Sequence, residues 1–232
     1  MKVKLKVKRT DPETGASRYS RYEIDAEQSI TLLDALIHVR EYEDGTLGLR
    51  CSCRSAICGS CAMRVDGRAR LACRSKVIAL TRGNEEHEMT VEPMGNMPVI
   101  RDLVTDMEMF WAKIRQVDPY LQPEGPEPEG EYRVPNEYML DLTHVMNCIM
   151  CGACVSDCTV LEVDKNFIAP ATLAKAYRFV GDPRDAHQVE RLRQYSEYGG
   201  IWDCTRCNMC VEVCPKGVAP MNRILQLREM AI

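Results

Sequence analysis

Thirteen cysteines stand in three groups along this chain of 232 residues, and their spacing constrains the fold more than any other feature. Five lie from Cys51 to Cys73, four from Cys148 to Cys158, and four from Cys204 to Cys214. A disulfide scaffold is normally a short secreted chain with an even number of cysteines. The start, MKVKLKVKRT, is basic, but the apolar run of a signal peptide does not follow it. The cysteines are therefore expected to be reduced and to act as ligands.

The first group contains the spacing C-x4-C-x2-C, and eleven residues separate its last cysteine from a fourth. This is the plant-type pattern of a [2Fe–2S] site, in which one loop brings three thiolates together. Gly59 and small neighbouring residues permit the tight path of such a loop. The predicted ligands are Cys53, Cys58, Cys61 and Cys73. The alternatives are a zinc loop, although zinc sites favour C-x2–4-C pairs, or free thiols. Cys51 lies outside the pattern and is interpreted as a neighbouring free thiol.

The other two groups repeat one pattern, C-x2-C-x2-C-x3-C, with an offset of 56 residues. In two-cluster ferredoxins with this run, the fourth cysteine of each run binds the other cluster. The predicted ligands are Cys148, Cys151, Cys154 and Cys214 for the first [4Fe–4S] cluster, and Cys158, Cys204, Cys207 and Cys210 for the second. A zinc ribbon would use two C-x2-C pairs and leave four cysteines unexplained. Pro215 follows the second run, whereas Thr159 stands after the first.

The N-terminal part of the chain predicts several strands around one helix. Apolar residues recur at every second position in the first two of these strands, as expected for half-buried strands. The expected strands cover 2–8, 20–26, 62–65 and 89–92. Thr31 and Asp34 form a capping-box-like start to a helix whose apolar stripe extends to Val39. This α+β pattern, with a cysteine loop after the helix, favours a β-grasp ferredoxin domain.

The C-terminal part lacks alternation and predicts helices. Residues 172–180 and 186–198 have helical spacing, and they separate the two C-terminal cysteine groups. Helices between two cysteine loops indicate an α-helical two-cluster ferredoxin domain.

A strap at 118–135 carries five prolines and five acidic residues, which keep such a segment extended. We expect two domains joined by this strap, an N-terminal domain over 1–105 and a C-terminal domain over 106–232 that includes the strap.

Charge and motifs exclude several classes of function. The 30 basic residues are scattered among 34 acidic ones, without the basic patch of a nucleic-acid-binding protein. The longest uncharged stretch, 142–156, is too short for a transmembrane helix. Nucleotide-binding glycine motifs and a nucleophile elbow are absent. The four histidines are dispersed along the sequence, and we expect each to be a surface or core residue and not a catalyst: His38, His87, His144 and His187. We therefore expect an electron carrier without a catalytic site, with flavin, nicotinamide or quinone chemistry on partner chains.

The order of these features, and the segments between the cysteines, resemble the iron–sulfur subunit of succinate dehydrogenase and fumarate reductase (respiratory complex II). The similar segments are CRSAICGSCAMRVDGRARLAC, PVIRDLVTDMEMFW with DPYL, NCIMCGACVSDC, FIAPATLAKAYRF and CVEVCPKG. The resemblance implies electron transfer between an FAD-containing flavoprotein subunit, facing the [2Fe–2S] domain, and a quinone site in membrane-anchor subunits, nearest the second [4Fe–4S] cluster. It also implies a peripheral subunit, without a transmembrane segment of its own, at the cytoplasmic face of the cell membrane.

Two departures from the family pattern stand out. Cys207 occupies a position that is usually not cysteine, so a [4Fe–4S] cluster is expected where the family usually has [3Fe–4S]; without Cys207 as a ligand the cluster would be [3Fe–4S]. Thr159–Val163 and Thr205 stand where family members often carry a tryptophan and a histidine near the quinone. Quinone-binding residues are therefore not assigned, and Trp202 is interpreted as a packing residue.

Two other functions remain open at the level of sequence. One is the iron–sulfur subunit of a related thiol- or glycolate-linked oxidoreductase. The other is a free ferredoxin-like carrier without a fixed complex. The sequence does not fix whether succinate oxidation or fumarate reduction is the physiological direction.

Overall fold

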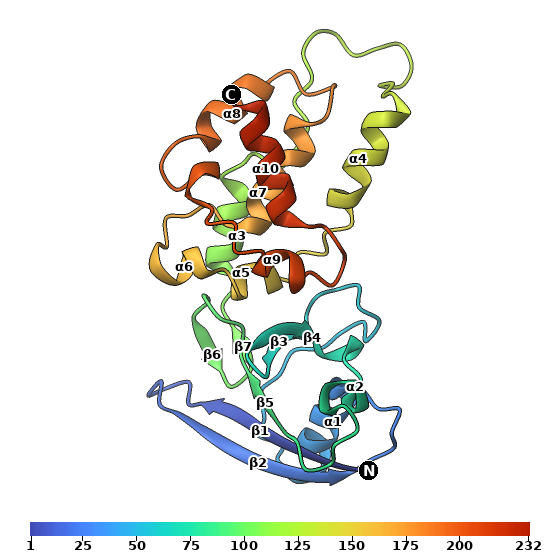
Figure 1. Cartoon of the computed structure of the whole chain (residues 1–232), viewed down its shortest axis with the longest axis vertical. Helices are drawn as coiled ribbons and strands as arrows, with labels where there is room; N and C mark the ends of the chain where they lie inside the picture. Colours follow the sequence, from blue (N-terminus) through green and yellow to red (C-terminus); the bar gives the residue numbers. More distant parts are fainter. The chain divides into compact units, whose positions relative to one another are not determined.

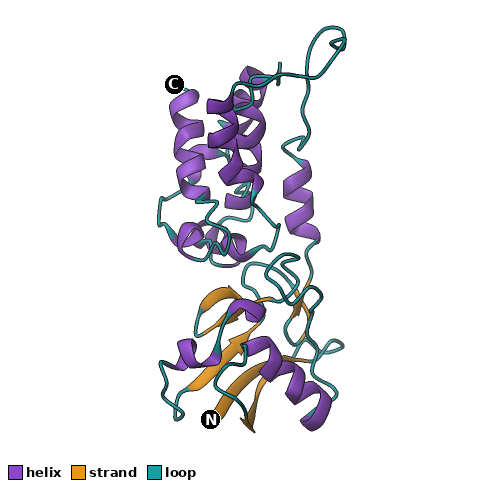
Figure 2. Cartoon of the chain, turned by 90° about the vertical axis from the view of Figure 1, so that its right-hand side faces the viewer, coloured by secondary structure: helices purple, strands orange, loops and turns teal.

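The computed structural model describes all 232 residues, which form two compact units (Figure 1). Unit 1 comprises Met1–Met107 and Ile149–Asp157, and unit 2 comprises Glu108–Cys148 and Cys158–Ile232. All strands belong to unit 1, whereas unit 2 consists of helices and loops (Figure 2). Residues 149–157, which contain the middle of the first C-terminal cysteine run, therefore belong to unit 1.

Unit 1 is built on a five-stranded sheet with the order β2-β1-β5-β3-β4 and a separate two-stranded sheet, β6-β7. β1 and β5 are parallel, and the other neighbouring strands of the large sheet are antiparallel. The strands are β1 (Lys2–Thr10), β2 (Ser17–Asp25), β3 (Ala62–Val65), β4 (Arg68–Leu71), β5 (Glu88–Glu92), β6 (Val99–Arg101) and β7 (Val104–Thr105). The helices of unit 1 are α1 (Leu32–His38), the π-helix η1 (Val39–Glu43), the 3-10 helix η2 (Ala72–Arg74), α2 (Val77–Thr81) and α5 (Ala153–Ser156).

The core of unit 1 follows from the alternation in β1 and the apolar face of α1. Val3, Leu5 and Val7 are buried, and their lysine neighbours on β1 are not. The five buried residues of α1 are Leu32, Leu33, Ala35, Leu36 and Ile37. The predicted capping box is confirmed, because the Asp34 N–H donates to the Thr31 hydroxyl and the Thr31 N–H donates to the Asp34 carboxylate. The sheet and its helix have the expected β-grasp arrangement.

Unit 2 is a helical unit in which α7 and α10 pack against each other (Figure 1). Both helices have eleven residues and begin at a proline, Pro170 or Pro220, at the first helical position. The helices of unit 2 are α3 (Glu108–Arg115), α4 (Asn136–Met146), α6 (Thr159–Val163), α7 (Pro170–Val180), α8 (Gln188–Tyr195), η3 (Ile201–Asp203), α9 (Met209–Glu212) and α10 (Pro220–Met230). The predicted helices at 172–180 and 186–198 correspond to α7 and to the shorter α8.

The proline-rich strap at 118–135 connects α3 to α4 and so lies inside unit 2, not between the two units. Its start is held by Arg191, which is buried and donates hydrogen bonds to the carbonyls of Val117, Asp118 and Tyr120 at 2.8–3.0 Å. Sequence patterning could not predict these long-range bonds, which tie the strap to α8.

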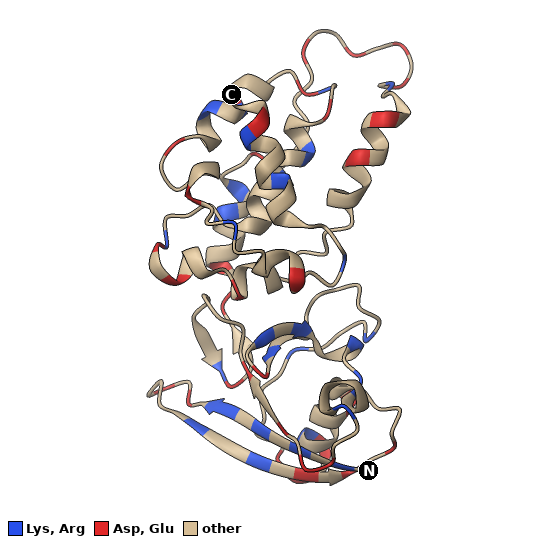
Figure 3. Ribbon diagram, viewed as in Figure 1, with Lys and Arg blue, Asp and Glu red and all other residues tan.

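Figure 3 shows basic and acidic residues interspersed along the ribbon of both units. Neither unit contains a helix with the length and apolar character needed to cross a membrane. Several charged residues are nevertheless buried, among them Asp102, Asp185 and Arg191, and these make hydrogen bonds or ion pairs inside their units.

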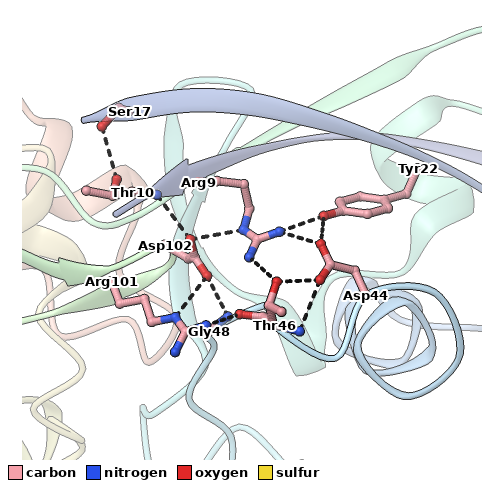
Figure 4. Close-up of polar contacts among 9 residues, drawn as sticks. All are labelled: Arg9, Thr10, Ser17, Tyr22, Asp44, Thr46, Gly48, Arg101 and Asp102. Carbon is pink, nitrogen blue, oxygen red and sulfur yellow. Dashed lines mark hydrogen bonds and ion pairs between the residues drawn. The ribbon is translucent and has the colours of Figure 1, made fainter. Parts of the chain in front are cut away.

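A buried polar network in unit 1 joins β1 to the segment that leads into the first cysteine group (Figure 4). Arg9 forms ion pairs with Asp44 at 2.5 Å and with Asp102 at 2.9 Å. The Asp102 carboxylate also accepts the backbone N–H of Thr10 at 3.0 Å and that of Gly48 at 2.7 Å. Asp102 is 2% exposed, so its charge depends on these partners. The network therefore fixes the chain shortly before the cysteine loop.

Replacing Asp102 with Ala leaves the Arg9 guanidinium buried with one ion-pair partner fewer. We expect the free energy of unfolding to fall by about 3 kcal/mol, the usual cost of breaking a buried ion pair. Urea unfolding of the purified chain, followed by circular dichroism, measures this change. Glu23→Ala is the control, because the Lys2–Glu23 pair is about half exposed on both sides and its loss should not shift the transition measurably. Equal effects of the two substitutions would contradict the role of the network.

Candidate iron–sulfur centres

The loop of the first cysteine group aims backbone N–H groups at cysteine sulfurs. The Cys53 Sγ accepts hydrogen bonds from three of them, those of Ser55 at 3.3 Å, Ile57 at 3.4 Å and Cys58 at 3.3 Å. The Cys73 Sγ accepts the N–H of Ala56 at 3.3 Å. Hydrogen bonds from N–H groups stabilise thiolates, which are the form that binds iron. The loop therefore provides a donor set for a [2Fe–2S] cluster.

This loop needs residues with left-handed backbone conformation. Arg54, Ala56 and Gly59 have φ values of 55°, 55° and 74°. A non-glycine residue in this region costs about 1–2 kcal/mol, and the cysteine spacing requires the reversal of chain direction that these residues provide. The small residues seen in the sequence thus serve the path of the loop.

The thiols of this loop differ in their protonation. Hydrogen bonds from the Ser60 hydroxyl and from the backbone of Cys53 and Ser60 lower the pKa of the exposed Cys58 thiol to about 6. Burial raises the pKa of the Cys61 thiol to about 12, and the neighbouring Cys73 and Cys58 contribute to this rise. Cys61 therefore keeps its proton until a metal displaces it. Because Cys73 and Cys58 act on the pKa of Cys61, the three thiols lie close together. Cys53 lies beside Cys58, since the backbone N–H of each donates to the Sγ of the other.

The same loop touches the first C-terminal cysteine run within unit 1. A Cβ added to Gly59 would lie 2.8 Å from both the Cα and the Cβ of Cys151. Real side chains do not approach so closely, so only glycine fits between the two loops. The loop that carries three of the predicted [2Fe–2S] ligands therefore lies in van der Waals contact with a predicted [4Fe–4S] ligand.

Helix α5, which contains Cys154, is held by the segment around Gly95. The Gly95 N–H donates to the Ser156 hydroxyl at 2.9 Å, and the Asn96 side-chain amide donates to two carbonyls of α5. Asp157 accepts the N–H of Ala69, on β4, at 2.8 Å. These bonds explain why residues 149–157 belong to unit 1 although the sequence places them in the C-terminal domain.

The backbone repeats the offset of 56 residues that the sequence shows. Met150 and Arg206 have φ values of 54° and 57°, and Gly152 and Asn208 have values of 78° and 66°. Each pair is 56 residues apart, and so are α5 and α9, which follow Gly152 and Asn208 directly. The duplicated cysteine spacing is therefore a duplicated loop conformation.

The predicted ligands of the second [4Fe–4S] cluster come together in unit 2. Burial raises the pKa of the Cys210 thiol to about 12, and Coulombic interactions with Cys204, Cys158 and Cys207 contribute further to this rise. Burial likewise raises the pKa of Cys158, with contributions from Cys207 and Cys204. Cys158 and Cys210 are buried, whereas Cys207 is exposed. Cys210 and Cys158 thus lie near the other predicted ligands, Cys207 included, and the binding of one cluster by all four stays a prediction.

Arg228 on α10 orders the segment that enters the last cysteine run. Its guanidinium donates to the carbonyls of Ile201 at 2.8 Å, Trp202 at 3.0 Å and Cys204 at 2.8 Å. The guanidinium also lies over the Trp202 ring, 5.5 Å from its centroid. The Trp202 side chain is 47% exposed, so it is not a core residue, and its ring contacts the Arg228 guanidinium.

The four predicted ligands of the first [4Fe–4S] cluster belong to different units. Cys151 and Cys154 lie in unit 1, and Cys148 and Cys214 lie in unit 2. Their grouping around one cluster stays a prediction. The structure contains no group of three or more His, Cys, Asp or Glu side chains arranged for a single metal ion.

Two features of these sites escape sequence reasoning. The methyl groups of Met94, Met97 and Met107 lie next to Gly152. A Cβ added to Gly152 would lie 2.9 Å from the methyl carbon of Met97. The Thr159 hydroxyl donates to the Cys207 Sγ at 3.4 Å. Methionine and threonine are common in any chain, so no sequence signal marks these contacts. The one exception is the Thr159 contact, whose sequence signal is that Thr159 follows the first C-terminal cysteine run, whereas Pro215 follows the second.

Comparison with known proteins agrees with this division of sites. A family model for a 2Fe-2S iron-sulfur cluster binding domain matches residues 4–112, and one for a 4Fe-4S dicluster domain matches residues 144–218. Both expected ferredoxin-type domains are therefore confirmed.

Relatives resemble the chain over nearly its whole length. The fumarate reductase iron-sulfur subunit of Mycobacterium tuberculosis is 36% identical, with 96% of this chain and 90% of that protein covered. The succinate dehydrogenase iron-sulfur subunit of Paracoccus denitrificans is 35% identical, with 99% and 88% covered. A chain of the Mycobacterium smegmatis Sdh1 complex in the apo form is 27% identical and superposes with a TM-score of 0.90, covering 99% of this chain and 95% of that one.

Gly59→Ala tests the contact between the two cysteine loops. The added methyl group would overlap Cys151, so we expect lower occupancy of the [2Fe–2S] and first [4Fe–4S] clusters, measured by iron content and by EPR of the reduced protein. Gly67→Ala is the matched control, because Gly67 has a similar φ of 78° but nothing within 4 Å of an added Cβ. The strain of a left-handed alanine, about 1–2 kcal/mol, is then common to both variants. Equal cluster losses in the two would show that strain, and not the contact, matters.

Proposed function

The chain belongs to the family of succinate dehydrogenase and fumarate reductase iron–sulfur subunits, and on this premise we propose that it carries electrons between a flavoprotein and a membrane quinone site. The observation that carries the proposal is the first cysteine loop, whose backbone N–H groups point at the sulfurs of Cys53 and Cys73, together with the two C-terminal cysteine runs that share one loop conformation. Iron–sulfur clusters bound there would supply one-electron carriers. The chain has no nucleotide-binding motif of its own, so the substrate chemistry belongs to a partner.

We assign the ligands as the spacing predicts them. Cys53, Cys58, Cys61 and Cys73 would hold the [2Fe–2S] cluster; Cys148, Cys151, Cys154 and Cys214 the first [4Fe–4S] cluster; and Cys158, Cys204, Cys207 and Cys210 the second. The hydrogen bonds onto Cys53 and Cys73 support the first set. The mutual electrostatic effects of four thiols support the third. The second set rests on the repeat and on the known exchange of fourth cysteines between clusters.

The chain's own residues control the distances between carriers and their access to water. The contact between Gly59 and Cys151 keeps the first cysteine loop close to a [4Fe–4S] ligand. The buried thiols Cys61, Cys158 and Cys210 form the inner sides of their sites, whereas Cys58 and Cys207 form exposed sides. An exposed ligand at each of two sites supports entry of electrons at one and exit at the other.

The proposed partners are an FAD-containing flavoprotein subunit and membrane-anchor subunits that bind the quinone. The proposed location is peripheral, at the cytoplasmic face of the cell membrane, because the relatives are subunits of succinate dehydrogenase and fumarate reductase. We do not assign quinone contacts, since Thr159 and Thr205 stand where the family often has other residues.

Purification of the tagged chain from gently solubilised membranes tests this function. We expect it to be recovered with a flavin-containing subunit and a membrane subunit, in a complex that transfers electrons from succinate to a dye or from reduced dye to fumarate. Mass spectrometry identifies the subunits, and absorbance of the dye follows turnover. A complex that holds no flavin and turns over neither succinate nor fumarate would overturn the proposal.

Cys207→Ala tests the assignment of the second [4Fe–4S] cluster. Removal of one of four ligands leaves Cys158, Cys204 and Cys210, which suit a [3Fe–4S] centre, so EPR of the oxidised variant should show a [3Fe–4S] signal that the anaerobically prepared parent lacks. Cys51→Ala is the control and should leave all three clusters in place, because Cys51 lies outside each ligand pattern. A [3Fe–4S] signal of equal strength in parent and variant would contradict the assignment.

A further inference from the structure

Thr159 is the first residue of α6 and directly follows Cys158, yet its hydroxyl interacts with a cysteine from the other run. The Oγ1 atom donates a hydrogen bond to the Cys207 Sγ over 3.4 Å, and the two residues are 48 positions apart. Both residues belong to unit 2 and both are exposed. The bond therefore joins the chain after the Cys158 ligand to the exposed ligand of the same cluster.

The internal repeat shows that this bond has no equivalent at the other cluster. With the offset of 56 residues, Thr159 corresponds to Pro215 and Cys207 corresponds to Cys151. Proline has neither a side-chain hydroxyl nor a backbone N–H, so Pro215 has no donor to offer a sulfur. The two [4Fe–4S] sites share loop conformation but differ in this hydrogen bond.

Cys207 is the exposed member of its predicted ligand set, whereas Cys158 and Cys210 are buried. The Thr159 hydroxyl therefore donates to a sulfur that lies at the surface of unit 2.

We propose that Thr159 is a positioning residue that raises the reduction potential of the second [4Fe–4S] cluster through its hydrogen bond to Cys207. This inference rests on the proposed function, in which Cys207 is a cluster ligand. Reduction adds negative charge that spreads onto the cysteine sulfurs, and a donor to one of them stabilises the reduced form more than the oxidised form. Hydrogen bonds to the sulfurs are among the factors that set the potentials of such clusters.

The test is an EPR-monitored redox titration of the whole complex with Thr159→Val and Thr159→Ser variants. Valine keeps the shape of threonine without the hydroxyl, and serine keeps the hydroxyl. We expect valine to lower the reduced-to-oxidised ratio of the second cluster at a fixed potential by up to about tenfold, which is about 59 mV for a one-electron couple. Serine should retain most of the parent value, and the first [4Fe–4S] cluster, titrated in the same samples, should not shift.

Two outcomes would overturn the inference: an unchanged or higher potential in the valine variant, or an equal downward shift with valine and serine. If valine prevents assembly of the cluster, Thr159→Ala takes its place with the same expected direction. The Cys207→Ala variant distinguishes failure of the role of Thr159 from failure of Cys207 as a cluster ligand. A [3Fe–4S] centre in that variant with no shift in the valine variant removes only the role of Thr159. An intact [4Fe–4S] cluster in Cys207→Ala removes the ligand assignment itself.

Discussion

Two residues separate each of the first three cysteines in both C-terminal runs. Three thiols so close in sequence can face one point only if the backbone between them turns sharply. The structure meets this requirement with left-handed residues at matching positions, Met150 and Gly152 in one run and Arg206 and Asn208 in the other. Three of these four are not glycine, so the loops store strain of about 1–2 kcal/mol per residue. The buried packing around α5 and α9, and the binding of metal, offset that cost.

The duplicated loops sit in different surroundings, and their functions can differ for that reason. Helix α5 is bound to unit 1 through Gly95, Asn96 and Asp157, and its loop touches Gly59. The loop that leads to α9 is ordered by Arg228 and contacted by Thr159. One sequence pattern thus yields one loop next to the first cysteine loop and another in which a hydroxyl donates to the exposed Cys207, a predicted ligand. Such differences in surroundings are among the factors that give otherwise similar clusters different reduction potentials.

The sequence predicts the elements whose pattern is local. The strand at 62–65, the capping box at Thr31 and the repeat of cysteine runs all appear as expected, because alternation, capping and spacing are properties of neighbouring residues. β4, with its two arginines, and the β6–β7 hairpin escape prediction because their strands form through partners elsewhere in the chain. The assignment of 149–157 to unit 1 and the position of the strap inside unit 2 depend on tertiary hydrogen bonds, which spacing does not encode. The contact between Gly59 and Cys151 is likewise a tertiary contact between distant parts of the sequence, and cysteine spacing does not predict it.

The central claim is that every cluster of this subunit is fully ligated by cysteine, including the one that contains Cys207. Mössbauer spectroscopy of the complex, enriched in ⁵⁷Fe and purified without oxygen, tests it most directly because it counts the irons in each type of cluster. The account predicts ten irons in this chain, two in a [2Fe–2S] cluster and eight in two [4Fe–4S] clusters. A spectrum with a [3Fe–4S] component and nine irons would contradict it.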